Sequence, residues 1–345
     1  MSAPQVFSGH AFVGEDLVLL PVDIVTENGI ITAVEEIKKA PPVWICPALY
    51  NAHTHLADTI AMDYPVKGDL VSLVTPPDGL KHRLLAQASS EELAGAMRAS
   101  ISGMMAAGTR GCADFREGGA KGVFALKKAA DRLAFRADIF GREGGEMVSE
   151  GLGISSTRDI RHVELQVRAA RAAGKKVAIH AGEQDKGDID AAIALDPDLL
   201  IHMTHATKTQ CRACADNGIP VVICPRSNWL LGVTSSSRHP PVKMMLELGC
   251  TVLLGTDNVM FVPPDMFSEM AFLHTCYGID PQSILGMAVK GSGLFGSPFF
   301  IRKGSPAAFF AVDCARSALR FSHDPVASLI KRACYGLIGD NVFNL

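Results

Sequence analysis

The sequence predicts an α/β fold: a TIM (β/α)8 barrel accompanied by a small β-domain that both chain termini build. Between residues 43 and 255, short apolar strands alternate with helical segments, a pattern typical of parallel strand pairing. Eight such strands can be counted, the number that closes this kind of barrel. A doubly wound open sheet is the alternative, but no Gly-x-Gly-x-x-Gly follows any of the strands.

Strands outside this alternation predict the β-domain. Near the N-terminus they cover residues 11–13, 16–20, 23–25 and 30–34. Asn28-Gly29 separates the last two and is typical of a hairpin turn. Near the C-terminus we expect strands over 307–312, 324–330 and 341–345. The predicted domains are a discontinuous β-domain, 1–46 with 303–345, and a barrel, 47–302.

The barrel elements follow one another in order. We expect strands over residues 43–51, 109–115, 134–140, 151–155, 176–180, 199–204, 220–224 and 251–255. Helical patterns cover residues 91–107, 122–132, 160–173, 189–195, 209–217 and 242–248. Gly108, Gly174, Gly218 and Gly249 each come directly after a helical pattern, where glycine favours the left-handed end of a helix.

Composition excludes several classes of protein. The net charge is −3 and basic residues do not cluster, so we expect no nucleic-acid partner. No apolar run approaches the roughly 18–20 residues of a membrane helix, and no signal peptide is recognisable. The nine cysteines include Cys46, Cys224 and Cys250 in apolar strands, which indicates buried thiols in a reducing compartment. We expect a cytoplasmic protein with a small-molecule substrate, and a homo-oligomer is compatible with these data.

The most informative feature is His53-Thr54-His55 at the end of the first barrel strand. Residues two apart in a strand point to the same face, so both imidazoles reach one point in space. Alone, such a pair is weak evidence for a metal site. Its meaning depends on whether other strands supply ligands at the same rim.

Four of the eight predicted strands have histidine, glutamate or aspartate at or just after their C-terminal ends, the side of a TIM barrel where active sites lie. Strand five ends at His180, with Glu183 three residues on, and strand eight ends beside Asp257. Strand six offers His202 and His205. Each could be explained separately, as a core histidine, a loop charge or, for Asp257, a helix N-cap. Their convergence on one rim favours a metal site.

Three imidazole nitrogens and one carboxylate oxygen, from His53, His55, His180 and Asp257, suit zinc first, with iron or manganese as alternatives. A catalytic site of this kind keeps a position for water, whose pKa the metal lowers towards ~7. Asp257 can serve as ligand and base, and Glu183 as general acid if burial raises its pKa. One strand-six histidine can orient the water.

Cys211 and Cys214 have metal-like spacing, but no second pair matches them and they fall on a helical pattern. A structural zinc there is disfavoured, and their role stays open.

Taken together, the blocks resemble the amidohydrolase superfamily, in the branch of cytosine, guanine and S-adenosylhomocysteine-type deaminases and triazine hydrolases. The resemblance extends from residue 44 to residue 294. Its blocks are Asn51-Ala52-His53-Thr54-His55, His180-Ala181-Gly182-Glu183, Thr204-His205-Ala206-Thr207, Cys224-Pro225-Arg226-Ser227-Asn228 and Leu254-Gly255-Thr256-Asp257-Asn258.

The resemblance implies one divalent metal held by His53, His55, His180 and Asp257. It implies that Glu183 passes a proton to a ring nitrogen of the substrate, and that His205 rather than His202 contacts the hydrolytic water. His205 is preferred because Ala206-Thr207 match its block. Members with two metals carry a lysine after strand four; this chain has Ser155-Ser156 there, which favours one metal.

Two loops depart from the family pattern. Arg116-Glu117-Gly118-Gly119 follows strand two and Arg142-Glu143-Gly144-Gly145 follows strand three. Each pair is either a surface salt bridge or a recognition site in which Arg116 or Arg142 binds a carboxylate or phosphate of the substrate. His82 is a third candidate substrate contact, within the segment 63–83 that we expect to form a lid.

These features predict a metal-dependent hydrolase that releases ammonia from an amino-substituted nitrogen heterocycle, such as a nucleobase, nucleoside or pterin. Hydrolysis of a cyclic amide or imide, or of a carbon–halogen bond, is the alternative within the same chemistry. A non-catalytic metal-binding barrel is the alternative outside enzymology, and it is disfavoured because no ligand or acid is missing.

Overall fold

The computed structural model describes residues 3–65, 70–74, 79–315, 317–333 and 335–338. Its contacts divide it into two compact units. The first comprises Met1–Tyr50, Gly103–Gly111 and Asp265–Leu345, and the second Asn51–Ser102 and Cys112–Pro264. These units differ in extent from the predicted domains, whose limits of 1–46, 47–302 and 303–345 stay a prediction.

Strands from both ends of the chain share one sheet in the first unit, as the fold prediction requires. The sheet has the order β14-β4-β1-β2-β3. Its strands are β1 (Gln5–Val13), β2 (Val18–Glu27), β3 (Ile30–Glu36), β4 (Val43–Pro47) and β14 (Phe309–Asp313). Asn28 and Gly29 have positive φ angles of 50° and 74°, the geometry of a tight hairpin turn. The small sheet domain is thereby confirmed.

The predicted strand over residues 324–330 is wrong, because this segment forms helix α12 (Pro325–Arg332). The Asp324 side chain accepts a hydrogen bond from the Ala327 amide at 2.9 Å, and Pro325 occupies the first helical position. Both are helix-start signals that outweigh the apolar run Val326 to Ile330. The strand expected over 341–345 lies outside the described residues.

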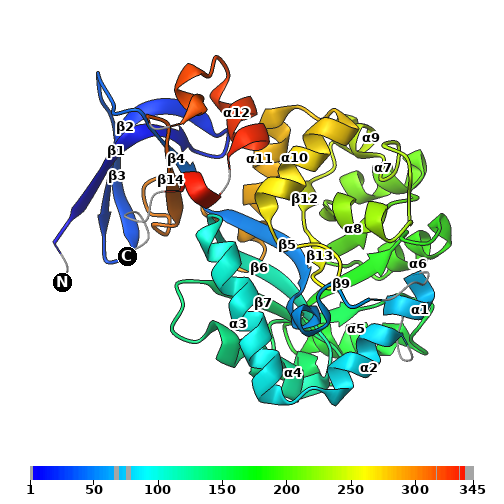
Figure 1. Ribbon diagram of the computed structural model, residues 1–345. Coiled ribbons are helices and arrows are strands. Elements are labelled where there is room, and N and C mark those ends of the chain that lie inside the picture. The colour runs from blue at the N-terminus through cyan, green and yellow to red at the C-terminus, as the bar shows by residue number, and fades with distance from the viewer. Residues whose placement is uncertain (1–2, 66–69, 75–78, 316, 334, 339–345) are drawn as a thin grey trace. The chain divides into compact units, whose positions relative to one another are not determined.

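The second unit contains most of the barrel sheet, whose strand order is β12-β11-β10-β9-β8-β7-β6-β5-β13 (Figure 1). Its strands are β5 (Leu49–His55), β6 (Thr109–Arg116), β7 (Arg136–Gly141), β8 (Gly151–Ile154), β9 (Lys176–Ala181), β10 (Leu199–His202), β11 (Val221–Ile223), β12 (Val252–Leu254) and β13 (Asp257–Asn258). The predicted first strand is divided at Ala48, since β4 joins the small sheet and β5 joins the barrel.

The segment from β12 to β13 closes the barrel. Gly255 donates its amide to Ile223 of β11 at 3.0 Å, and the Thr256 amide donates to His53 of β5 at 3.1 Å. β13 then pairs with β5 in parallel, Asp257 opposite Thr54. One continuous segment therefore bonds to the first and the seventh barrel strands, and the predicted eight-stranded barrel is confirmed.

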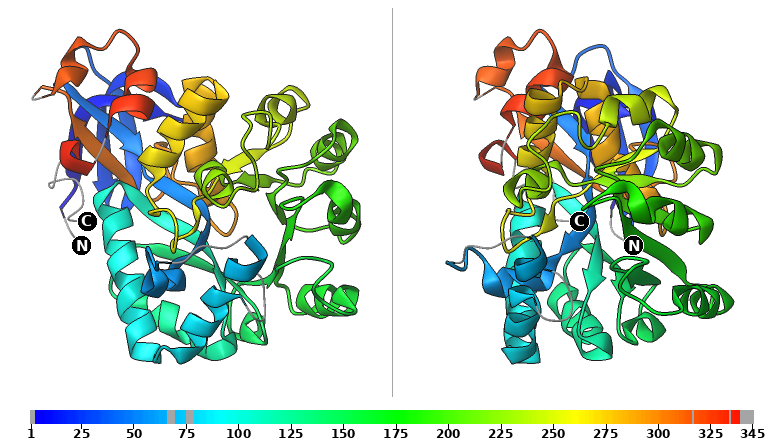
Figure 2. Two further views of the ribbon diagram at one scale, coloured as in Figure 1. Left: turned by 45° about the vertical axis from the view of Figure 1, so that its right-hand side comes forward. Right: turned by 90° about the vertical axis from the view of Figure 1, so that its right-hand side faces the viewer.

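Helices lie around the outside of the barrel strands in the second unit (Figure 2). The α-helices of the chain before α12 are α1 (Leu70–Val74), α2 (Leu80–Gln87), α3 (Ser90–Ala106), α4 (Gly119–Ala130), α5 (Val163–Ala172), α6 (Ile189–Ala194), α7 (Lys208–Asp216), α8 (Pro225–Leu230), α9 (Val242–Glu247), α10 (Met266–Tyr277) and α11 (Pro281–Lys290). Short 3-10 turns cover Leu56–Ala61, Gly145–Val148, Lys186–Asp188, Gly291–Gly293, Ala318–Phe321 and Tyr335–Leu337. Among the described residues, no helix combines the length and the apolar character needed to span a membrane.

Candidate active site

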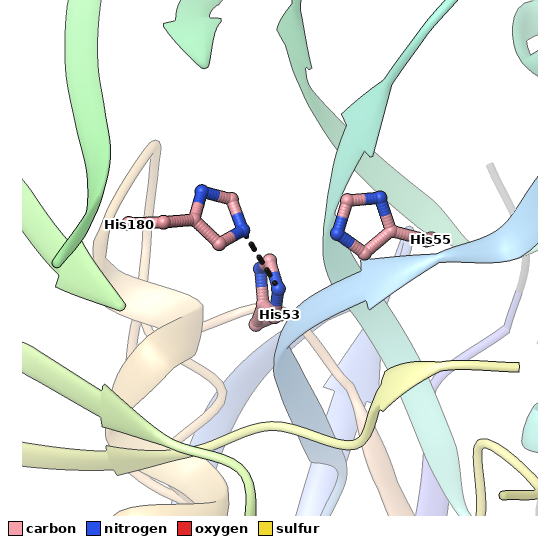
Figure 3. Close-up of side chains that lie close together, drawn as sticks. All are labelled: His53, His55 and His180. Atoms are coloured by element: carbon pink, nitrogen blue, oxygen red, sulfur yellow. Dashed lines mark hydrogen bonds between the residues drawn. The ribbon is translucent and has the colours of Figure 1, made fainter. Parts of the chain in front are cut away.

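Strands β5, β9 and β13 bring three histidines and one aspartate together at the C-terminal rim of the barrel. Figure 3 shows the rings of His55 and His180 on either side of His53. The Nε2 atoms of His53 and His180 are 3.3 Å apart. Oδ1 of Asp257, from β13, lies 3.1 Å from His53 Nε2 and 3.6 Å from His55 Nε2. The four predicted ligands therefore meet at one point.

A fifth group completes this cluster. His202, at the end of β10, lies with its ring centre 5.4 Å from that of His180. Within the described part of the chain, two triplets place one ligand atom each within 4.8 Å of one another: His53, His55 and His180, and His53, His202 and Asp257. All five side chains are buried. We call these five residues the histidine–aspartate cluster.

The protonation states of the cluster suit a cation. Burial lowers the pKa of His53 to about 4 and those of His55 and His180 well below their usual value, so these rings are neutral near pH 7. Burial opposes ionisation of Asp257, but the hydrogen bond with His53 and the nearby histidines hold its pKa well below its usual range. Neutral imidazoles and an ionised carboxylate are the forms that bind metals.

The donor atoms fit one divalent metal ion. Several nitrogen lone pairs and a carboxylate oxygen converge on a buried point, which is unfavourable unless a positive charge lies between them. A cation held by the cluster would satisfy these groups, and the residues present are the ligand types of zinc, iron and manganese sites.

Contacts to backbone and side chains fix the orientation of the ligands. Nδ1 of His180 lies 2.8 Å from the carbonyl oxygen of Ile154, which can only accept, so Nδ1 carries the proton and Nε2 is free for a metal. Ser227 donates its hydroxyl proton to Oδ2 of Asp257 at 2.6 Å, which leaves Oδ1 towards the histidines. Sequence reasoning missed this role of Ser227, although its block was noticed.

Asn51 joins the strand that carries His53 and His55 to the segment that carries Asp257. Its side-chain amide donates to the Thr256 hydroxyl at 2.7 Å, and its Oδ1 accepts the Thr256 amide at 3.0 Å. This buried pair of hydrogen bonds joins β5 to the segment that carries Asp257. The adjoining Asp257 has a positive φ of 63°, a conformation that needs such support.

Replacing Asn51 with alanine is expected to lower the free energy of unfolding by about 1–3 kcal/mol, because both buried hydrogen bonds to Thr256 are lost and its amide keeps only the His53 carbonyl as acceptor. Urea denaturation measures the change. Asn217→Ala, at an exposed helix end, is the control and should cost about 0.5 kcal/mol or less. Equal effects of the two substitutions would contradict this role for Asn51.

Glu183 lies beside the cluster, in a cavity that its side chain lines together with His55, His180, His202 and Asp257. Its Oε1 is 3.7 Å from Nε2 of His202, and its side chain is 23% exposed. Burial raises the pKa of Glu183 above its usual value, with His202 acting in the opposite direction. A carboxyl in this environment can hold a proton for delivery to a substrate.

The two strand-six histidines are placed differently from the expectation. His202 belongs to the cluster, whereas the His205 ring packs against His239 at 5.4 Å and is partly exposed. β10 ends at His202, whose φ of 73° departs from extended geometry, so the strand does not continue to Thr204. The geometry therefore favours His202 for the role that the family resemblance implied for His205.

Of the three candidate substrate contacts, Arg142 alone lines the cavity beside the cluster. Arg116 is buried with 1% exposure and binds Asp114 and Glu117 at 3.2 and 2.5 Å. Arg116 and His82 line a second cavity instead. From the segment expected to form a lid, Val74 and Lys81 line the first cavity, while Pro76, Pro77 and Asp78 lie outside the described residues.

Cys211 and Cys214 are buried free thiols on α7. Burial raises the pKa of each to about 12.

Fold and site together define a barrel hydrolase with a metal-type centre, and comparisons with known proteins agree. A family model described as adenosine deaminase matches residues 144–294. A putative aminohydrolase from Methanothermobacter thermautotrophicus is 32% identical over 377 residues, which cover 96% of this chain and 95% of that protein. The chain belongs to the amidohydrolase superfamily, among its aminohydrolases.

A more distant relative agrees with this placement, and a solved structure agrees with the fold. A 5-methylthioadenosine/S-adenosylhomocysteine deaminase from Halobacterium salinarum is 25% identical over 270 residues, covering 66% of this chain and 60% of that protein. The structure of a guanine deaminase from C. acetobutylicum with bound guanine superposes with a TM-score of 0.71, at 14% identity and 97% coverage of both chains. The protein is a metal-dependent hydrolase of carbon–nitrogen bonds, of the deaminase type.

Proposed function

We propose that the protein removes an amino group hydrolytically from a nitrogen heterocycle such as a nucleobase, nucleoside or pterin, using one divalent metal ion, zinc in the first place. The observation that carries this proposal is the Glu183 carboxyl, with its raised pKa, beside the histidine–aspartate cluster in one cavity. An acid next to a metal site is what protonation of a ring nitrogen during attack at the neighbouring carbon requires.

The metal would be held by His53, His55, His180 and Asp257. When bound, a divalent metal supplies a water molecule that loses its proton near neutral pH. Asp257 Oδ1, ionised and directed at the cluster, accepts a proton from the water. His202 orients that water from the β10 side, and Glu183 donates its proton to the ring nitrogen next to the amine-bearing carbon. The water oxygen bonds to the amine-bearing carbon, the proton on Asp257 goes to the amine, and the C–N bond breaks to release ammonia. The remaining water proton returns to Glu183 as the carbonyl of the product forms.

Arg142 is the substrate contact that the geometry supports. Its Nη2 lies 3.2 Å from His180 Nδ1, but that nitrogen already donates to Ile154 and cannot accept. Within the described residues, the buried Nε of Arg142 also has no hydrogen-bond partner. A guanidinium with spare donors at the cavity wall would bind a carbonyl oxygen, carboxylate or phosphate of the substrate.

Two observations support the proposed location and partners. The described cysteines are all free, and most are buried, which supports a reducing, cytoplasmic location. The net charge of −3 supports the absence of a nucleic-acid partner. A homo-oligomer stays compatible with both observations.

A screen for ammonia release tests the proposal. The zinc-loaded protein is incubated with amino-substituted purines, pyrimidines, nucleosides and pterins, and ammonia is measured. We expect one ammonia per substrate consumed for at least one compound. If no amine releases ammonia, but cyclic amides or imides are opened or halide is released, the protein is instead a hydrolase of those bonds.

Replacing His202 with asparagine is expected to lower kcat by about 10²–10⁴-fold, because the group that orients the water is lost. His205→Asn is the matched control, three residues away on the same connection, and should change kcat less than about threefold since that ring packs against His239. Ammonia release with the substrate found by the screen measures both. The reverse order of effects would restore the role to His205.

A further inference from the structure

The two Arg-Glu-Gly-Gly loops, residues 116–119 and 142–145, form one interlocked structure that we call the double loop. The Arg142 amide donates to the Arg116 carbonyl at 3.1 Å, and the Gly118 amide donates to Oε2 of Glu143 at 3.1 Å. A Cβ on Gly119 would lie 2.9 Å from the carbonyl oxygen of Glu143. The glycines therefore allow the two backbones to approach closely, and the repeat of the motif is explained by packing.

The double loop brings Glu117 against the histidine–aspartate cluster. Oε1 of Glu117 lies 2.9 Å from Nδ1 of His55, 3.0 Å from Lys81 Nζ and 3.3 Å from Arg142 Nη1. Its Oε2 lies 2.5 Å from Arg116 Nη2. This one buried carboxylate, with 5% exposure, thus faces three cations and a ring nitrogen of His55, a proposed metal ligand.

Two further acids balance these charges and hold the strand end that carries His55. Asp58 lies 2.9 Å from Lys81 Nζ, and Asp114 lies 3.2 Å from Arg116 Nη1. Asp114 also accepts hydrogen bonds from the Thr54 hydroxyl at 3.0 Å and the Leu56 amide at 2.7 Å. The network thus pairs three acids with three bases and holds the residues on both sides of His55.

We infer that Glu117 is a positioning residue for His55. Its carboxylate lies at ion-pair distance from Nδ1, although not aligned as a hydrogen bond, and its charge favours the imidazole proton on that nitrogen. Nε2, which lies 3.6 Å from Oδ1 of Asp257, then offers its lone pair to the metal. Ion pairs with Lys81, Arg116 and Arg142 hold the Glu117 carboxylate in place. Arg116 therefore serves the metal centre through Glu117. This inference rests on the proposed one-metal site.

The alternatives are less consistent with the contacts. An ion-pair network that only stabilised the loops would not need a carboxylate oxygen against His55, because Lys81, Arg116 and Arg142 already provide partners for Glu117. A substrate-binding Arg116 would need to reach the cavity beside the cluster, which it does not line. The contact with His55 is what distinguishes positioning from packing.

The test measures zinc affinity in a chelator competition with purified wild-type protein and Glu117→Gln. Outer partners of metal-bound histidines typically contribute 10–100-fold, and we expect a loss of that size, about 10–100-fold, in Glu117→Gln. The visible absorption spectrum of the cobalt-loaded protein should also shift, because His55 is reoriented. Glu143→Gln, the exposed glutamate of the second loop, is the control and should leave affinity and spectrum unchanged.

Unchanged zinc affinity and an unchanged cobalt spectrum in Glu117→Gln would overturn the inference. If that variant does not fold, Glu117→Asp keeps the charge and withdraws the carboxylate by one methylene; a loss of affinity again supports positioning, and wild-type affinity contradicts it. Wild-type protein that binds zinc but releases no ammonia in the screen would overturn the proposed function while leaving the effect of Glu117 on zinc measurable.

Discussion

Replacing Glu183 with glutamine is expected to lower kcat for ammonia release by about 10²–10⁴-fold, the usual contribution of a general acid. The amide is nearly isosteric but has no acidic proton for the ring nitrogen. Because Glu183 is not one of the proposed metal ligands, metal content and thermal unfolding should stay at wild-type values. Steady-state assays with the substrate found by the screen measure the loss.

Glu164→Gln, on the exposed face of α5, is the matched control and should keep wild-type turnover. A Glu183→Gln variant with full activity would show that the proton comes from elsewhere. The proposed mechanism would then lose its acid, although the metal site itself would not be affected.

Replacing Asp257 with asparagine is expected to remove both metal and activity. The variant loses the anionic ligand, and its amide would face a neutral His53 nitrogen that Oδ1 now approaches to 3.1 Å. Loss of proton transfer alone corresponds to about 10²–10⁴-fold in kcat, and loss of metal adds to it. Elemental analysis and ammonia release on the same preparation measure the two effects.

Asp216→Asn, at an exposed position near the end of α7, controls for the change of charge and should retain metal and turnover. Wild-type metal content and kcat in Asp257→Asn would refute the assignment of Asp257. Wild-type metal content with low kcat would limit its role to the proton.

Much of the fold was predictable because strand and helix periods and glycine stops are local signals. The hairpin at Asn28-Gly29 and the eight barrel strands depend on neighbours in sequence, and the structure has them. The meeting of His53, His55, His180 and Asp257 was predictable for a second reason: in a TIM barrel every strand end lies on one rim.

Side-chain partners across the sheet were not predictable. The choice between His202 and His205 depends on where β10 ends and on the φ of His202, which no sequence pattern shows. Arg116 was a candidate substrate contact with a surface salt bridge as the alternative, but its partners Asp114 and Glu117 are buried with it. Residues 324–330 were read by their apolar content, whereas Asp324 and Pro325 set a helix start.

Metal stoichiometry is the most direct test of a single-metal aminohydrolase centre in this protein. Elemental analysis of the purified protein is made before and after incubation with zinc, iron or manganese, with ammonia release measured in parallel. We expect about one equivalent of metal per chain, with activity proportional to occupancy, since the cluster offers one set of ligands. Less than about a tenth of an equivalent, with no activation by any of the three metals, would contradict the account.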